Sequence, residues 1–101
     1  MMSEVQGPLE IDVWEFEWDE HNERHCAGHG VTPLVAELVK DGFPKFFQNK
    51  PAKTGTHMMI GPNGTGRFWT IILLETGQRG RWRPITGWPS DTPEMARYNS
   101  T

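Results

Sequence analysis

Three strand-like segments set the architecture of this chain: His57-Met58-Met59-Ile60-Gly61, Arg67-Phe68-Trp69-Thr70-Ile71-Ile72-Leu73-Leu74 and Arg81-Trp82-Arg83-Pro84-Ile85-Thr86. They are rich in the β-branched and aromatic residues that favour strands. An Asn63-Gly64 turn, which is a strong hairpin signal, joins the first two, and a glycine-containing turn at residues 76–80 joins the last two. We therefore expect an antiparallel three-stranded meander. Because Pro84 has no backbone N–H, its strand has to lie at a sheet edge or be bulged there.

A strand and a short helix are expected at the start of the domain. Residues 12–18 alternate polar and apolar side chains, which predicts a half-buried strand with Trp14, Phe16 and Trp18 on one face. Asp19 is a suitable N-cap for a helix over residues 20–27, and Gly28 and Gly30 bracket its end.

A second helix is expected to begin at Thr32-Pro33 and to run to about Lys40, where Gly42 closes it. Its apolar stripe consists of Leu34, Val35, Leu38 and Val39. Residues 43–47 are a candidate short strand, residues 48–55 form a polar loop, and Asp91 begins a last short helix through Tyr98.

The order of these elements, β-α-α-β-β-β-α, predicts an α+β fold with a small antiparallel sheet and the two N-terminal helices on one face. A chain of 101 residues is expected to form one domain. We expect a flexible N-terminal arm over residues 1–11 and a single domain over residues 12–101.

The composition of the chain restricts its expected cellular location. No apolar run approaches the roughly 20 residues of a membrane span, and the N-terminus lacks the pattern of a secretory signal. The single cysteine, Cys26, cannot form an internal disulfide, so a reducing cytoplasm is the expected location.

Charge is distributed unevenly along the chain, although the net charge is only -3. Residues 1–23 hold eight of the thirteen acidic residues and no Lys or Arg, whereas residues 24–101 hold all ten basic residues and five acids. The last two-thirds of the chain is therefore basic, which is compatible with an anionic partner such as nucleic acid. The alternative is an ordinary solvated surface.

His21, His25 and His29 recur every four residues, which places them near one face of a helix. His21 and His25 are spaced to share a metal ion, but His29 follows Gly28, where the helix should have ended. We therefore expect His25 and His29 to pack or to hydrogen-bond at the helix end, and a metal site on His21 and His25 is the minor alternative.

In its order of motifs the chain resembles the BrnT-like toxins of bacterial type II toxin–antitoxin pairs, over roughly residues 14–99. The opening motif is Phe16-x-Trp18-Asp19, Asn22, His25 and His29-Gly30-Val31; the middle one is Met59-Ile60-Gly61 followed by Gly66-Arg67; the closing one is Arg81-x-Arg83-x-Ile85-Thr86 followed by Glu94, Arg97 and Tyr98.

The resemblance implies a RelE/ParE-like fold and a ribonuclease that slows translation by cutting RNA, free or bound to the ribosome. It also implies a cognate antitoxin of the ribbon-helix-helix-like, BrnA type. Such cleavage uses neither a metal nor another cofactor. This chain departs from the family in carrying Thr86-Gly87-Trp88 where Ser-Ala-Arg is usual, and in having Pro84 in the closing strand.

Metal-free RNA cleavage needs a base, an acid and cations that stabilise the charge at phosphorus. Arg81 and Arg83 alternate on one strand, so they should project from the same face as phosphate ligands, and Arg67 could join them from the neighbouring strand. The expected catalytic residues are Arg81, Arg83, Tyr98, His57 and His25. The expected RNA-binding residues are Arg67, Arg97, Trp88 and Lys53, with Trp88 outside the strand and exposed for stacking.

A second hypothesis is a catalytically inactive interaction module that keeps the toxin fold. Trp88 in place of the family's arginine and Pro84 in the closing strand favour it. Cleavage of RNA by the purified protein separates the two hypotheses.

Overall fold

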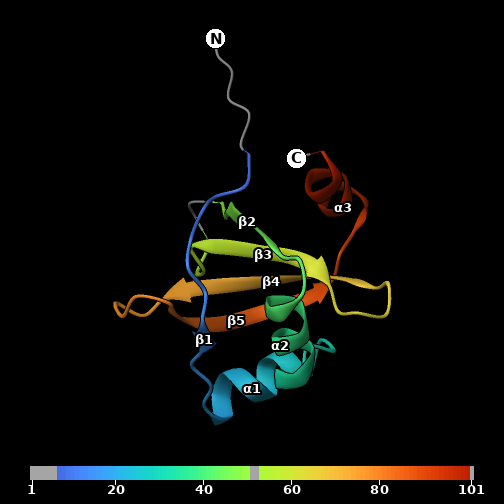
Figure 1. Cartoon of the computed structure of the whole chain (residues 1–101). Helices are drawn as coiled ribbons and strands as arrows, with labels where there is room; N and C mark the ends of the chain where they lie inside the picture. Colours follow the sequence, from blue (N-terminus) through green and yellow to red (C-terminus); the bar gives the residue numbers. More distant parts are fainter. Residues whose placement is uncertain (1–6, 51–52, 101) are drawn as a thin grey trace.

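A computed structural model of the chain describes residues 7–50 and 53–100. In chain order its elements are β1 (Glu15–Phe16), α1 (Glu20–Ala27), α2 (Pro33–Asp41), β2 (Lys45–Gln48), β3 (His57–Pro62), β4 (Phe68–Glu75), β5 (Arg81–Pro89) and α3 (Thr92–Asn99). The five strands form one sheet in the order β1-β5-β4-β3-β2 (Figure 1). The α+β class and the antiparallel meander, β3-β4-β5, are confirmed.

The expectation of a purely antiparallel sheet is wrong, because β1 pairs with β5 in parallel. This strand is also far shorter than the expected residues 12–18: only Glu15 and Phe16 enter the ladder, opposite Arg81 and Trp82. Trp14 stays outside it, with its side chain 59% exposed, and the chain turns into α1 after Asp19.

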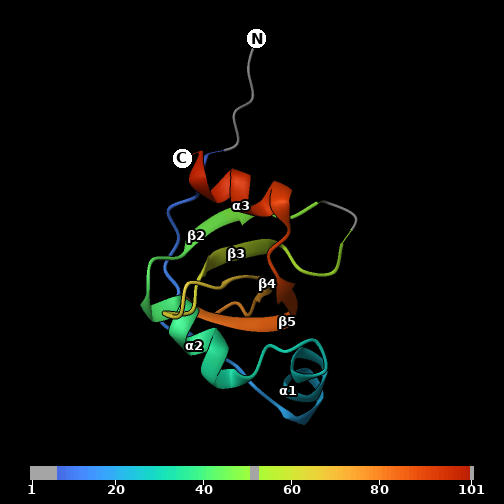
Figure 2. The same ribbon diagram turned by 90° about the vertical axis from the view of Figure 1, so that its right-hand side faces the viewer.

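Opposite faces of the sheet are covered by different elements. The core face carries Phe16, Met59, Ile71, Leu73 and Trp82, which pack with residues of α1 and α2. In Figures 1 and 2, α2 and the segment before β1 cross this face. Helix α1 lies along the β5 edge, and α3 lies beside β2, at the opposite edge of the sheet. Of the two N-terminal helices expected on one face, α2 therefore covers the core face and α1 packs along the sheet edge.

The apolar stripe expected on α2 is wrong in part. Ala36 and Val39 are fully buried, whereas Leu34 and Leu38 are 67% and 44% exposed. The ammonium group of Lys40 donates a hydrogen bond to the Trp14 carbonyl at 2.9 Å. The side of α2 that carries Ala36 and Val39 therefore faces the sheet.

A β-bulge at Pro84 is confirmed. Leu73 pairs with Pro84 and Ile72 pairs with Thr86, so Ile85 is an extra residue in β5. Directly paired residues share a face of the sheet. Without the bulge, Arg83 and Trp88 would lie on opposite faces because they are five residues apart; with it, they lie on the same face. We call this face, which α3 contacts, the α3 face.

The expected arm over residues 1–11 lies partly outside the described residues. Where it is described, the backbone N–H of Leu9 bonds to the Phe46 carbonyl at 2.7 Å, and Ile11 packs against the core. The chain is thus held to the domain from Leu9 onward. Within residues 7–50 and 53–100, no helix has both the length and the apolar character needed to cross a membrane.

Candidate functional site

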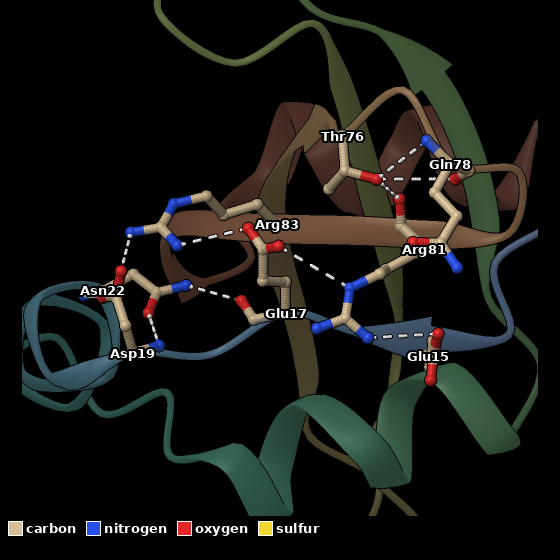
Figure 3. A network of polar contacts seen from close by, with 8 residues as sticks. All are labelled: Glu15, Glu17, Asp19, Asn22, Thr76, Gln78, Arg81 and Arg83. Atoms are coloured by element: carbon tan, nitrogen blue, oxygen red, sulfur yellow. Dashed lines mark hydrogen bonds and ion pairs between the residues drawn. The ribbon is translucent and has the colours of Figure 1, made fainter.

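Helix α1 is tied to the outer edge of β5 by the buried side chain of Asn22. Its amide donates hydrogen bonds to the carbonyls of Glu17 and Pro84, at 3.0 and 2.9 Å, and accepts one from the backbone N–H of Asp19 at 2.7 Å (Figure 3). The last bond completes a capping box, because the Asp19 carboxylate accepts from the N–H of Asn22. That hydrogen bond, aided by Arg83, lowers the pKa of Asp19.

Arg81 and Arg83 project from the α3 face, as expected, but both are engaged by acidic residues of the N-terminal segment. Arg81 contacts Glu15 at 3.1 Å and Glu17 at 3.6 Å. Arg83 contacts Glu17 at 3.5 Å and Asp19 at 2.8 Å. Figure 3 shows the two guanidinium groups facing these carboxylates. We call these five residues the arginine–carboxylate network.

The network changes the electrostatics expected from the sequence. Two guanidinium groups face three carboxylates, so the group has a net charge of about -1 rather than a positive surplus. Arg79 is likewise paired, with Asp12 at 2.8 Å. Acidic residues of the N-terminal segment are thus paired with these arginines, so Arg81 and Arg83 do not form the uncompensated cationic pair expected of phosphate ligands. An additional anion would be repelled here until a carboxylate moves away.

The expected partnership of Arg67 with the other two arginines is also wrong. Arg67 precedes β4, whereas Arg81 lies beside the end of that strand, about 25 Å away at the usual rise per residue. Its guanidinium group stacks over the Trp69 ring at 5.2 Å. Arg97 stacks over the Phe47 ring at 4.5 Å, on the α3 face.

Tyr98 and His57 do not converge with Arg81 and Arg83 either. The Tyr98 hydroxyl donates to the Phe43 carbonyl at 2.6 Å, at the opposite end of the sheet from the network. The His57 and Trp82 rings pack edge to face on the core face, with their centroids 4.8 Å apart. Four of the five expected catalytic residues are therefore divided among two faces and two ends of the sheet.

A groove on the α3 face brings together three other residues expected from the sequence, namely His25, Lys53 and Trp88. Its volume is about 480 Å³. Met58, Ile72 and Ile85 form an apolar floor. α1, β5, the loop before β3 and the start of α3 therefore surround one depression.

Trp88 is part of this groove, although not in the way the sequence suggested. It lies within β5, which extends to Pro89, and it is half-buried rather than exposed outside the strand. Its indole N–H donates to both carboxylate oxygens of Glu94 at 3.0 Å. The Glu94 carboxylate also accepts hydrogen bonds from the Thr70 hydroxyl, at 3.0 Å, and from the backbone N–H of Asp91, the N-cap residue of α3. The indole is thus fixed in the groove wall by a carboxylate whose hydrogen bonds are satisfied.

Two charged groove residues, Glu94 and Lys50, were not among those expected to act. The Asp91-x-x-Glu94 pattern is a capping-box signal that would have placed Glu94 at the start of α3. Its contact with Trp88 depends on the length of β5 and could not be found from the sequence. Lys50 and Lys53 are both exposed at the rim. They add a cationic edge to the apolar floor of the groove.

Of the three histidines spaced by four residues, His25 and His29 contact each other at the end of α1. The two rings pack edge to face with their centroids 5.2 Å apart, which agrees with the expected packing at the helix end. In the part of the chain that the structure describes, no three His, Cys, Asp or Glu side chains are grouped to hold a metal ion. The nearby Cys26 thiol is fully buried, and this burial raises its pKa to about 11.

Comparison with family models, curated proteins and solved structures finds no match for this chain.

Proposed function

We propose that this chain is a BrnT-like ribonuclease toxin with a RelE/ParE-like fold, and that its RNA binds in the groove on the α3 face. The observation that carries the proposal is that this groove gathers His25, Lys53 and Trp88 beside Lys50. The α+β class and the meander β3-β4-β5 support the proposal, while the element order differs from the predicted β-α-α-β-β-β-α by the additional strand β2.

The groove has the features that single-stranded RNA requires. Unpaired bases bind apolar and aromatic surfaces, here Trp88 and the floor residues, while ammonium groups attract the phosphates. His25 contributes an imidazole to the groove lining, a side chain that enzymes commonly use as a general acid or base. It would accept the proton of the attacking 2′-hydroxyl or protonate the departing 5′ oxygen, with no metal or cofactor in the step.

The remaining parts of the proposal follow the family resemblance. The partner is a ribbon-helix-helix-like antitoxin of the BrnA type, the RNA is free or bound to the ribosome, and the place of action is the cytoplasm. An antitoxin that occupies the groove would exclude RNA from it.

The first test is growth on induced expression, together with incubation of the purified protein with single-stranded RNA. We expect growth arrest and RNA cleavage. His25→Ala should abolish cleavage while RNA is still bound, because the floor and the lysines remain. His21→Ala, one helical turn away on α1 and outside the groove lining, is the matched control and should cleave like the wild type.

A second candidate function is the inactive interaction module with the same fold. It is favoured by the separation of Arg81, Arg83, Tyr98 and His57, and by the carboxylates that occupy both arginines. This candidate predicts RNA binding without cleavage and normal growth on expression. A protein that neither binds RNA nor slows growth would contradict the ribonuclease proposal.

A further inference from the structure

The arginine–carboxylate network lies on the same face of the sheet as the groove. We infer that Glu15 and Glu17 mask Arg81 and Arg83, whose ligand is the phosphate backbone of RNA that continues out of the groove. The inference rests on the proposed RNA-binding role of the groove.

The arginines lie where such an RNA would continue. Thr86 and Trp88 of the groove share the α3 face with Arg83 and Arg81, because the bulge at Pro84 brings the two halves of β5 onto one face. The distance from Trp88 to Arg83 along the strand is roughly 15 Å. One strand therefore carries both the aromatic wall of the groove and the two guanidinium groups.

The carboxylates take the positions that phosphate oxygens would take. A guanidinium group binds carboxylate and phosphate oxygens with the same planar set of donors. Arg81 has a Glu15 oxygen at 3.1 Å and a Glu17 oxygen at 3.6 Å, and Arg83 has the other Glu17 oxygen at 3.5 Å. Glu15 and Glu17 are thus internal substitutes for an anionic ligand (Figure 3).

These carboxylates can leave without unfolding β1. The Glu15 and Glu17 side chains are 54% and 39% exposed, and exposed ion pairs of this kind are weak. The backbone of β1 stays anchored by Phe16, which is 7% exposed, so the glutamates need only change rotamer. Asp19 is different, because it also caps α1, and it remains in place.

The test is a gain of affinity for a fluorescently labelled single-stranded RNA, measured by anisotropy. In the double variant Glu15→Gln/Glu17→Gln we expect binding about tenfold tighter than wild type at low salt, because removing each carboxylate from contact distance changes affinity by roughly threefold to fivefold in water. The gain should disappear in molar salt, where charges are screened within about 3 Å.

The matched control is Glu20→Gln/Glu23→Gln, which changes the net charge equally in the first turn of α1, outside the network. Equal affinities of the two double variants would overturn the inference. Adding Arg81→Gln and Arg83→Gln to the first variant should remove the gain, whereas a gain that persists would also contradict the mask.

A further variant separates this inference from the proposed function. Lys50→Glu/Lys53→Glu weakens RNA binding in the groove if the proposed function is correct. If these changes leave wild-type binding unaltered while Glu15→Gln/Glu17→Gln still increases affinity, the groove assignment fails and the masked site stands. If the lysine changes weaken binding and the glutamine changes have no effect, the mask fails and the groove stands.

Discussion

Replacing Asn22 with alanine should destabilise the protein strongly, although the residue lies on a short surface helix. The Asn22 side chain is 2% exposed and makes three hydrogen bonds, two of them to the Glu17 and Pro84 carbonyls. Each such bond is worth about 1 kcal/mol, and the buried Pro84 carbonyl would lose its partner on α1. We expect the free energy of unfolding to fall by about 3 kcal/mol, a large share of the roughly 5–15 kcal/mol typical of a domain.

The measurement is urea unfolding followed by tryptophan fluorescence and analysed by linear extrapolation. His21→Ala, at the exposed neighbouring position of α1, is the matched control and should change stability by less than about 0.5 kcal/mol. Asn22→Asp tests the donors separately, because a carboxylate keeps the shape of the amide but cannot donate to the two carbonyls when it is ionised.

A loss below about 1 kcal/mol for Asn22→Ala would refute this reasoning. It would mean that apolar contacts alone, such as those of the buried Cys26 and Val31, hold α1 against the sheet. A loss for Asn22→Ala that Asn22→Asp does not share would contradict the importance of the two donated bonds.

Three further predictions concern backbone geometry and protonation. Gly80→Ala should destabilise more than Gly77→Ala: both glycines have positive φ, but a Cβ at Gly80 would collide with the Trp14 ring, whereas Gly77 has open space, and thermal unfolding of the two variants checks this. Cys26 should resist thiol reagents at pH 8 in the native protein and react once urea unfolds it, because its thiol is buried and its pKa is about 11; rapid native labelling would contradict its burial. The folded-state pKa of Asp19 is lowered from 3.8, so its contribution to stability is present above that value and lost as pH falls through the folded pKa; the stability gap to Asp19→Asn should therefore close in acid, and a gap independent of pH would contradict this.

Local signals in the sequence predicted the elements well. Asp19, Thr32 and Asp91 are N-caps in the structure, and Gly28 and Gly42 are C-caps. Caps and hairpin turns depend on neighbouring residues alone, which explains why the sequence was sufficient for them.

Errors arose where distant segments meet. Residues 12–18 have the alternation of a strand, but only Glu15 and Phe16 pair in the ladder with β5, because α1 packs along the following part of its edge. Leu34 and Leu38 have the spacing of a core stripe, but Ala36 and Val39, on another side of α2, are the residues that pack in the core. Neither contact has a local signature.

The candidate site shows the same limit. Alternation correctly placed Arg81 and Arg83 on one face, but the pattern could not reveal that acidic residues about 65 positions earlier would pair with them. The proline signalled the bulge in β5, yet the consequence, that Trp88 shares a face with Arg83, required the register between β4 and β5. The groove is lined by residues of α1, the loop before β3, β3, β4, β5 and α3, so it is visible only in three dimensions.

Binding of single-stranded RNA to the Lys50→Glu/Lys53→Glu variant tests the central claim most directly. Anisotropy at low salt should show affinity at least about tenfold weaker than wild type, because each substitution replaces an attraction for phosphate with a repulsion. The control Arg24→Glu/Arg79→Glu makes the same change in net charge at two exposed sites outside the groove and should lose much less. Equal losses in both variants, or wild-type affinity in the lysine variant, would contradict RNA binding in the groove.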